Sequence, residues 1–162
     1  MNDVYDYDSD IINPRKIKSG LEGSVLSPVY HTTVRFAAYV STVLIFLISL
    51  LTRKAQNMFV TTVVIFGGWQ YSAPPLRLKE IPLLDSCSNG LGIFFGWLIG
   101  YTFGRGRLSD IPGDKVFVLS LCTAGMHALA AAVDVEPDNV AGQTTIATFF
   151  GCRFAAVFAA SM

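Results

Sequence analysis

Hydrophobic residues gather in five long stretches along the chain, and short polar segments separate them. The stretches cover residues 34–52, 57–71, 86–104, 115–133 and 144–162. A helix needs about 20 residues to cross the hydrocarbon core of a bilayer, and most of these stretches are long enough. The second is short and runs into Pro74 and Pro75, which end a helix. The pattern predicts an all-α fold, a polytopic transmembrane bundle with about five membrane helices.

Composition and glycine spacing refine this picture. The 162 residues are 52% hydrophobic and 15% charged, whereas soluble domains carry about 25% charged residues, so the composition favours lipid surroundings. The net charge is +0 and no basic run occurs, so nucleic acid is not an expected partner. The third stretch carries glycines at four-residue spacing: Gly92, Gly96, Gly100 and Gly104. This repeat predicts a smooth helix face against which a neighbouring backbone packs closely.

The polar segments sort into two groups if each stretch crosses the membrane once. Residues 1–33, 72–85 and 134–143 then share one membrane face, and residues 53–56 and 105–114 share the other. Of the twelve acidic residues, only Asp110 and Asp114 fall on the second face. Basic residues are nearly balanced between the faces, so the positive-inside rule does not orient the chain. The acidic asymmetry points to chemistry on the first face.

The first acidic cluster spans residues 2–10. Four of its members recur at three- or four-residue spacing and would line one side of a helix: Asn2, Asp3, Asp6 and Asp10. Oxygen ligands at this density suit a hard cation such as Mg²⁺. An EF-hand is excluded, because Ile11 and Ile17 stand where that loop requires glycine and glutamate. A solvated acidic tail is the alternative interpretation.

The second cluster lies at the end of the fourth apolar stretch, where Asp134 and Asp138 are again four residues apart. Helix ends often carry acids, so this pair alone is weak. Between the clusters, Arg77 and Lys79 follow the second stretch and supply cationic donors suited to phosphate, although an ordinary basic membrane edge is the alternative. Together the three segments predict Mg²⁺ bridging carboxylates to a diphosphate. A diphosphate beside a lipid-exposed cavity indicates an isoprenoid donor.

These motifs resemble the UbiA superfamily of intramembrane prenyltransferases. Residues 2–10 match its first motif, N-D-x-x-D-x-x-x-D, and residues 134–138 match its second, D-x-x-x-D. Residues 71–79 resemble the loop between the motifs, and the resemblance runs over the whole chain. Residues 13–16, 71–85 and 126–142 look more narrowly like the lycopene elongase branch, which acts in carotenoid biosynthesis.

The resemblance implies a role for each group of polar residues. The Mg²⁺ ligands would be Asn2, Asp3, Asp6, Asp10, Asp134 and Asp138. The diphosphate of dimethylallyl diphosphate would be bound by Arg77, Lys79, Asn13, Arg15 and Lys16. Tyr71, with Arg77 and Lys79, would stabilise charge on the departing diphosphate. Lycopene would then attack the allylic cation, and Asp85 and His127 are candidates for the final proton transfer or water addition.

The resemblance also carries expectations about extent and location. The family is usually a bundle of about nine helices, and residues 1–162 would form part of one such domain. The chain starts at the first motif and stops in what should be the seventh helix. We therefore expect an integral, multi-pass protein of the cell membrane in a prokaryote, with the motif loops in the cytoplasm. Because an open site admits water to a carbocation, the chain alone is expected to be weakly active or inactive.

Two other functions fit the same features. One is a UbiA enzyme that prenylates an aromatic ring, as in quinone or chlorophyll synthesis. The other, from a different class, is a non-catalytic membrane protein that binds or transports divalent ions through its acidic residues.

Overall fold

The computed structural model describes residues 1–14, 16, 24–104 and 106–162, which form helices joined by turns and no strands. The long helices are α4 (His31–Leu51), α5 (Ala55–Ser72), α6 (Leu84–Phe103) and α7 (Gly113–Val133). The shorter ones are α1 (Asn2–Tyr5), α2 (Tyr7–Asp10), α8 (Val135–Val140), α9 (Ile146–Phe150) and α10 (Cys152–Ser161). Single 3₁₀ turns lie at Pro28–Tyr30, Leu78–Glu80 and Leu108–Asp110. The all-α prediction is confirmed.

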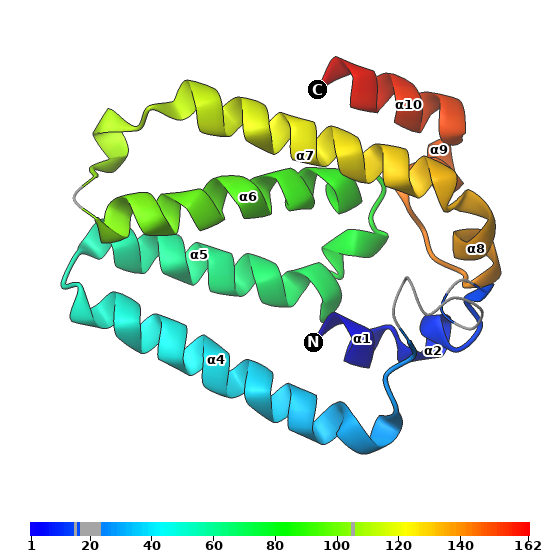
Figure 1. Ribbon diagram of the computed structural model, residues 1–162, viewed down its shortest axis with the longest axis horizontal. Helices are drawn as coiled ribbons and strands as arrows, with labels where there is room; N and C mark the ends of the chain where they lie inside the picture. Colours follow the sequence, from blue (N-terminus) through cyan, green and yellow to red (C-terminus); the bar gives the residue numbers. More distant parts are fainter. Residues whose placement is uncertain (15, 17–23, 105) are drawn as a thin grey trace.

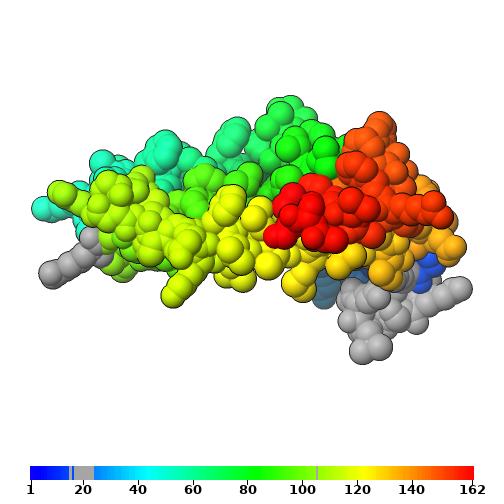
Figure 2. Space-filling model, turned by 90° about the horizontal axis from the view of Figure 1, so that it is seen from above, coloured from blue at the N-terminus to red at the C-terminus, as the bar shows by residue number. Residues whose placement is uncertain are grey.

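The four long helices lie side by side and alternate in direction, in the order α4, α5, α6, α7 (Figure 1). Helix α10 returns along α7, and Figure 2 shows these two helices packed together on one face. The alternation brings α1, α2, the Leu78–Glu80 turn and α8 to one end of the bundle (Figure 1). We call this the acidic end. The predicted grouping of residues 72–85 and 134–143 with the start of the chain follows from this topology.

Two glycines set the closest helix contacts, and neither belongs to the predicted stripe. A Cβ added at Gly90 of α6 would lie 2.5 Å from the carbonyl oxygen of Ser120 in α7. One added at Gly125 of α7 would lie 3.0 Å from the carbonyl oxygen of Ala159 in α10. By contrast, a Cβ at Gly92, Gly96 or Gly100 would meet no described atom within 4 Å, and one at Gly104 would meet the backbone oxygens of Tyr101 and Gly100 in the same segment, at 3.4 and 3.7 Å. The prediction of close packing along the stripe is therefore wrong for the described residues.

The fifth apolar stretch is not one continuous helix, contrary to the sequence prediction. Helix α9 starts at a capping box formed by Thr145 and Thr148, and it ends after five residues. Gly151 follows with φ of +88°, a conformation that favours glycine, and α10 continues for only ten residues. The break turns α10 back against α7 instead of extending the line of α9.

Within the described ranges, two helical segments are long and apolar enough to cross a membrane by themselves, namely Pro28–Leu51 and Gly113–Val133. Buried polar side chains join α4, α5 and α6 at the end of the bundle opposite the acidic end. Asn57 of α5 is fully buried, accepts a hydrogen bond from Ser49 of α4 at 2.7 Å, and donates to Thr102 of α6 at 3.0 Å. Such polar pairs join helices where hydrophobic driving force is weak.

Candidate functional site

Two adjoining cavities open at the acidic end. The inner cavity, about 200 Å³, is lined by Asn2, Asp6, Tyr71, Lys79, Glu80, His127, Ala130, Ala131, Asp134, Asp138, Gln143 and Thr145. The outer cavity, about 230 Å³, is lined by Asn2, Asp6, Asp10, Asn13, Lys16, Asp134, Pro137, Asp138 and Gln143. Both acidic motifs line both cavities, so the fold brings together residues that lie more than a hundred positions apart in the sequence.

The first wall comes from α1 and α2, which are two short helices that break at Asp6. The four-residue register survives the break, because Asp6 N donates to Asn2 O at 3.0 Å and Asp10 N donates to Asp6 O at 2.8 Å. Asp6 and Asp10 are 5% and 2% exposed, so both side chains are buried. Asp3 is exposed and lies outside the residues that line either cavity; its carboxylate is 3.6 Å from Lys16 Nζ. Asp8 is exposed as well.

Cations from elsewhere in the chain compensate the buried acids of this wall. Lys79 Nζ donates to Asp6 Oδ1 and lies 3.3 Å from Asn2 Oδ1. Lys16 Nζ donates to Asp10 Oδ2 at 2.6 Å. Burial lowers the pKa of the Lys79 ammonium, and the charges of Glu80 and Asp3 act in the opposite direction. The ammonium groups therefore occupy oxygens that would otherwise be free for a divalent cation.

The link between α5 and α6 aims its two cations at this wall. Arg77 has φ of +45°, and the Leu78–Glu80 turn follows directly, closed by a 2.8 Å bond from Glu80 N to Arg77 O. The guanidinium of Arg77 pairs with Glu80 and lies 3.9 Å from Asp6 Oδ1. Lys79 lines the inner cavity, whereas Arg77 is not among the residues that line either cavity.

The second wall is built where α7 ends and α8 begins. Asp134 is both the C-cap of α7 and the N-cap of α8. The backbone amide of Asp138 donates to the carbonyl oxygen of Asp134 at 2.9 Å. Asp138 is 8% exposed and lines both cavities. Gln143 follows on this wall and donates from Nε2 to Ser9 Oγ of α2 at 3.1 Å, which joins the two walls. Sequence reasoning missed Gln143, although it belongs to the same polar segment as the second motif.

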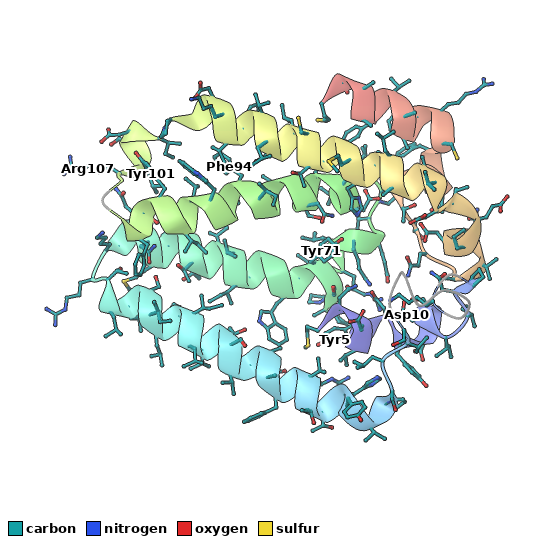
Figure 3. All side chains as sticks on the ribbon, in the orientation of Figure 1. Tyr5, Asp10, Tyr71, Phe94, Tyr101 and Arg107 are labelled. Carbon is teal, nitrogen blue, oxygen red and sulfur yellow. The ribbon has the colours of Figure 1, made fainter. Side chains whose placement is uncertain are left out.

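The remaining predicted residues separate into cavity and non-cavity positions. Tyr71 and His127 line the inner cavity, and Asn13 and Lys16 line the outer one; Figure 3 shows Tyr71 and, further out, Asp10 at this end of the bundle. Arg15 lies outside the described residues.

Asp85, a candidate for the final proton transfer, is buried away from the inner cavity. It is 0% exposed and lies outside the cavity lining, and its carboxylate accepts from Ser86 N and from Ile146 N, each at 2.7 Å. Asp85 therefore fixes the start of α9 to α6. Because both oxygens are engaged with backbone donors, the geometry does not favour it as the group that handles a proton of a substrate.

The donor set suits Mg²⁺ by its chemistry but not as a closed protein cage. Among the described residues, no three His, Cys, Asp or Glu side chains lie close enough together to hold a metal ion. The cavity-facing ligands are carboxylate and amide oxygens on two separate walls. Mg²⁺ is usually held by one or two carboxylates, with phosphate and water oxygens completing its shell. The carboxylates of either wall would hold Mg²⁺ together with a phosphorylated ligand.

Comparison with known proteins decides the family. The model of the UbiA prenyltransferase family matches residues 1–162. The chain belongs to the UbiA prenyltransferase family. This agrees with the resemblance of its two motifs, and UbiA proteins are integral membrane helical bundles, as the fold class predicted.

Curated relatives narrow the resemblance. A C50 β-cyclic carotenoid biosynthesis protein, LbtBC, of Dietzia sp. (strain CQ4) is 35% identical over 98% of this chain and 36% of its own length. Lycopene elongase/hydratases of Corynebacterium glutamicum and Haloarcula japonica are 34% and 38% identical over 94% and 93% of this chain. These alignments cover 53% and 49% of the two relatives, so the chain spans about half of their length. No solved structure matches the chain significantly.

Proposed function

We propose that this UbiA chain carries the diphosphate-binding half of a Mg²⁺-dependent prenyltransferase site. The donor is an allylic prenyl diphosphate, dimethylallyl diphosphate, and the acceptor is a lycopene-like carotenoid in the bilayer. The acceptor class rests on the names of the relatives, lycopene elongase/hydratase and carotenoid biosynthesis protein. The motif loops, which lie together at the acidic end of the bundle, would be cytoplasmic.

One observation carries the proposal. Acidic residues from α1–α2 and from α7–α8 face each other across the same cavities, and Lys79 reaches the same space from the α5–α6 link. A diphosphate placed between the walls would meet metal-binding oxygens on two sides and a cation on a third. A simple solvated acidic patch would leave these carboxylates exposed, whereas Asp6, Asp10 and Asp138 are buried.

The side chains divide the work of binding and catalysis. Mg²⁺, when bound, would neutralise the diphosphate and act as a Lewis acid on the leaving group. The residues that would hold it are Asn2, Asp6, Asp10, Asp134 and Asp138. Lys79 would exchange its contact with Asp6 for a phosphate oxygen, and Arg77 would support it. These charges are aimed at the position where negative charge develops as the allylic C–O bond breaks.

We further propose that the 162-residue chain alone turns over slowly. The chain spans about half of the length of its relatives, and an incompletely enclosed allylic cation reacts with water. Binding of the diphosphate is therefore the sharper readout.

The test is calorimetric titration of the chain in detergent micelles with pyrophosphate and with a thiolo analogue of dimethylallyl diphosphate. We expect Mg²⁺-dependent binding that Asp6→Asn and Asp138→Asn each weaken by at least about tenfold. Asp8→Asn and Glu136→Gln are matched controls, because they remove a charge from exposed positions of the same two segments and should leave the affinity unchanged.

Two results would contradict the proposal. Equal affinity for pyrophosphate in Mg²⁺ and in EDTA would show that the metal does not take part in binding. Mg²⁺ binding that pyrophosphate does not strengthen would favour the ion-binding alternative over a prenyltransferase site.

A further inference from the structure

Two polar side chains of α6, three residues apart, each hold a residue that lines the inner cavity. Ser86 Oγ lies 3.1 Å from Nδ1 of His127 in α7. Asn89 Nδ2 lies 3.1 Å from the hydroxyl oxygen of Tyr71 in α5. Neither Ser86 nor Asn89 lines the cavity. Their contacts nevertheless decide which hydrogen-bonding group His127 and Tyr71 present to a ligand.

The contact of Ser86 fixes the tautomer of His127. Ser86 is 0% exposed, and within the described part of the chain His127 Nδ1 is the only partner of its hydroxyl. A buried hydroxyl that donates to nothing is costly, so its hydrogen goes to the imidazole nitrogen. Nδ1 is then the acceptor of a neutral ring, and the ring proton lies on Nε2.

The opposite edge of the ring is the one available to a ligand. His127 lines the inner cavity, and its Nε2 has no hydrogen-bond partner among the described residues. On α7 it precedes Asp134 by two helical turns, or about 10 Å at 1.5 Å per residue. His127 thus places an N–H donor deeper in the bundle than the metal-binding acids.

The contact of Asn89 likewise leaves Tyr71 as a hydrogen-bond donor towards the cavity. Asn89 Nδ2 also donates to the carbonyl oxygen of Asp85 at 2.7 Å, and a carbonyl only accepts, so the orientation of the amide is settled. The second N–H of Asn89 is donated to the Tyr71 oxygen. The Tyr71 hydroxyl therefore accepts from α6 and keeps its own hydrogen for the cavity.

We propose that Ser86 and Asn89 are positioning residues that orient His127 and Tyr71 as hydrogen-bond donors for the leaving diphosphate. The inference rests on the proposed function of the site. When the allylic C–O bond breaks, its electron pair stays on the diphosphate oxygen, and hydrogen bonds to that oxygen strengthen as the charge grows. No proton leaves His127 in this step. His127 is thus a donor to the anion and not the acceptor of the final proton.

The first test needs no ligand. The chain contains two histidines, so ¹⁵N NMR of the His31→Gln variant in micelles reports on His127 alone. With Ser86 present, we expect the His127 tautomer that carries its proton on Nε2. Adding Ser86→Ala should give a mixture of tautomers, and Ser86→Thr, which keeps the hydroxyl, should restore the Nε2–H tautomer. A wild-type ring with its proton on Nδ1 would overturn the proposal.

The second test is pyrophosphate affinity in Mg²⁺. His127→Leu should weaken it by about tenfold, because a hydrogen bond to a charged group is lost. His127→Gln, whose amide N–H can replace Nε2–H, should retain most of it. Ser88→Ala is the control on α6, because among the described residues the Ser88 hydroxyl bonds only the carbonyl oxygen of Asp85, at 3.2 Å.

The two proposals fail in different ways. Unchanged affinity in His127→Leu, together with lost affinity in Asp6→Asn, would overturn the donor role alone. Unchanged affinity in both variants, or no binding by the wild type, would overturn the proposed function and this inference with it.

Discussion

The ammonium of Lys79 donates a hydrogen bond to the carboxylate of Asp6, which lies 73 residues earlier in the chain. The pair joins the first acidic motif to the α5–α6 link and keeps a buried carboxylate compensated while no divalent ion is bound. The same Asp6 oxygen is a proposed metal ligand. In the proposed function, Lys79 would compete with Mg²⁺ for Asp6 and would be free to contact the diphosphate when the metal is bound.

Removal of this cation should destabilise the metal-free chain. Lys79→Met removes the hydrogen-bonded cation of buried Asp6 and leaves it with the Arg77 guanidinium 3.9 Å away. Breaking a buried ion pair costs about 3–5 kcal/mol. The Lys79 side chain is 11% exposed, so we expect the lower end of that range in EDTA. Mg²⁺ should restore part of the stability by replacing the ammonium. Thermal unfolding by circular dichroism in EDTA and in Mg²⁺ measures both effects.

The control for this prediction is Lys115→Met, at an exposed position near the start of α7. It should change stability little in either buffer. A loss of stability in Lys79→Met that Mg²⁺ leaves unaltered would contradict the competition between the ammonium and the metal.

Asp85 should prove structural. Asp85→Asn keeps one acceptor oxygen, so either the Ser86 or the Ile146 amide loses its partner at a cost of about 1–3 kcal/mol. Hydrogen exchange at the Ile146 amide should accelerate, whereas Mg²⁺-dependent pyrophosphate affinity should stay within about twofold of wild type, because the acids of both walls remain. Asp114→Asn, at an exposed site in the first turn of α7, is the matched control. Loss of pyrophosphate binding with unchanged stability would return Asp85 to the catalytic site.

Two glycines of α6 provide a matched pair for helix packing. Gly90→Ala places a methyl group 2.5 Å from the backbone oxygen of Ser120 and should destabilise the α6–α7 contact by about 1–3 kcal/mol. The methyl group added by Gly92→Ala would lie within 4 Å of no described atom. Alanine stabilises a helix by about 0.5–1 kcal/mol relative to glycine. Denaturant unfolding in micelles should therefore give effects of opposite sign, and equal effects would contradict the helix register.

Gln143 should matter for ligand binding because it joins the walls. Gln143→Leu removes the bond to Ser9 and a polar group from both cavities. We expect pyrophosphate affinity to fall by about threefold to tenfold, the worth of one or two hydrogen bonds. Asn139→Leu changes an exposed amide on α8 and should have no such effect. An equal loss in both variants would assign the effect to the fold of the loop.

Much of this architecture follows from the pattern of apolar residues. The stretches predicted at 34–52, 57–71, 86–104 and 115–133 form helices with ends within a few residues of those positions. Burial of backbone groups in an apolar phase leaves few alternatives to a helix. The four-residue spacing of Asn2, Asp6 and Asp10 likewise decided which side chains face one direction, since a local helical register is written in the chain.

Tertiary packing decided the rest. Periodicity alone does not state which glycine meets a neighbour, so the stripe from Gly92 to Gly100 was misjudged and Gly90 overlooked. The break at Gly151 depends on α10 packing against α7, a contact between segments distant in sequence. Asp85 and His127 carry the residue types of proton transfer, and the sequence assigned them that task. Tertiary structure supplies the contacts that bear on these roles: the Ile146 amide donates to the Asp85 carboxylate, and Ser86 Oγ lies beside Nδ1 of His127.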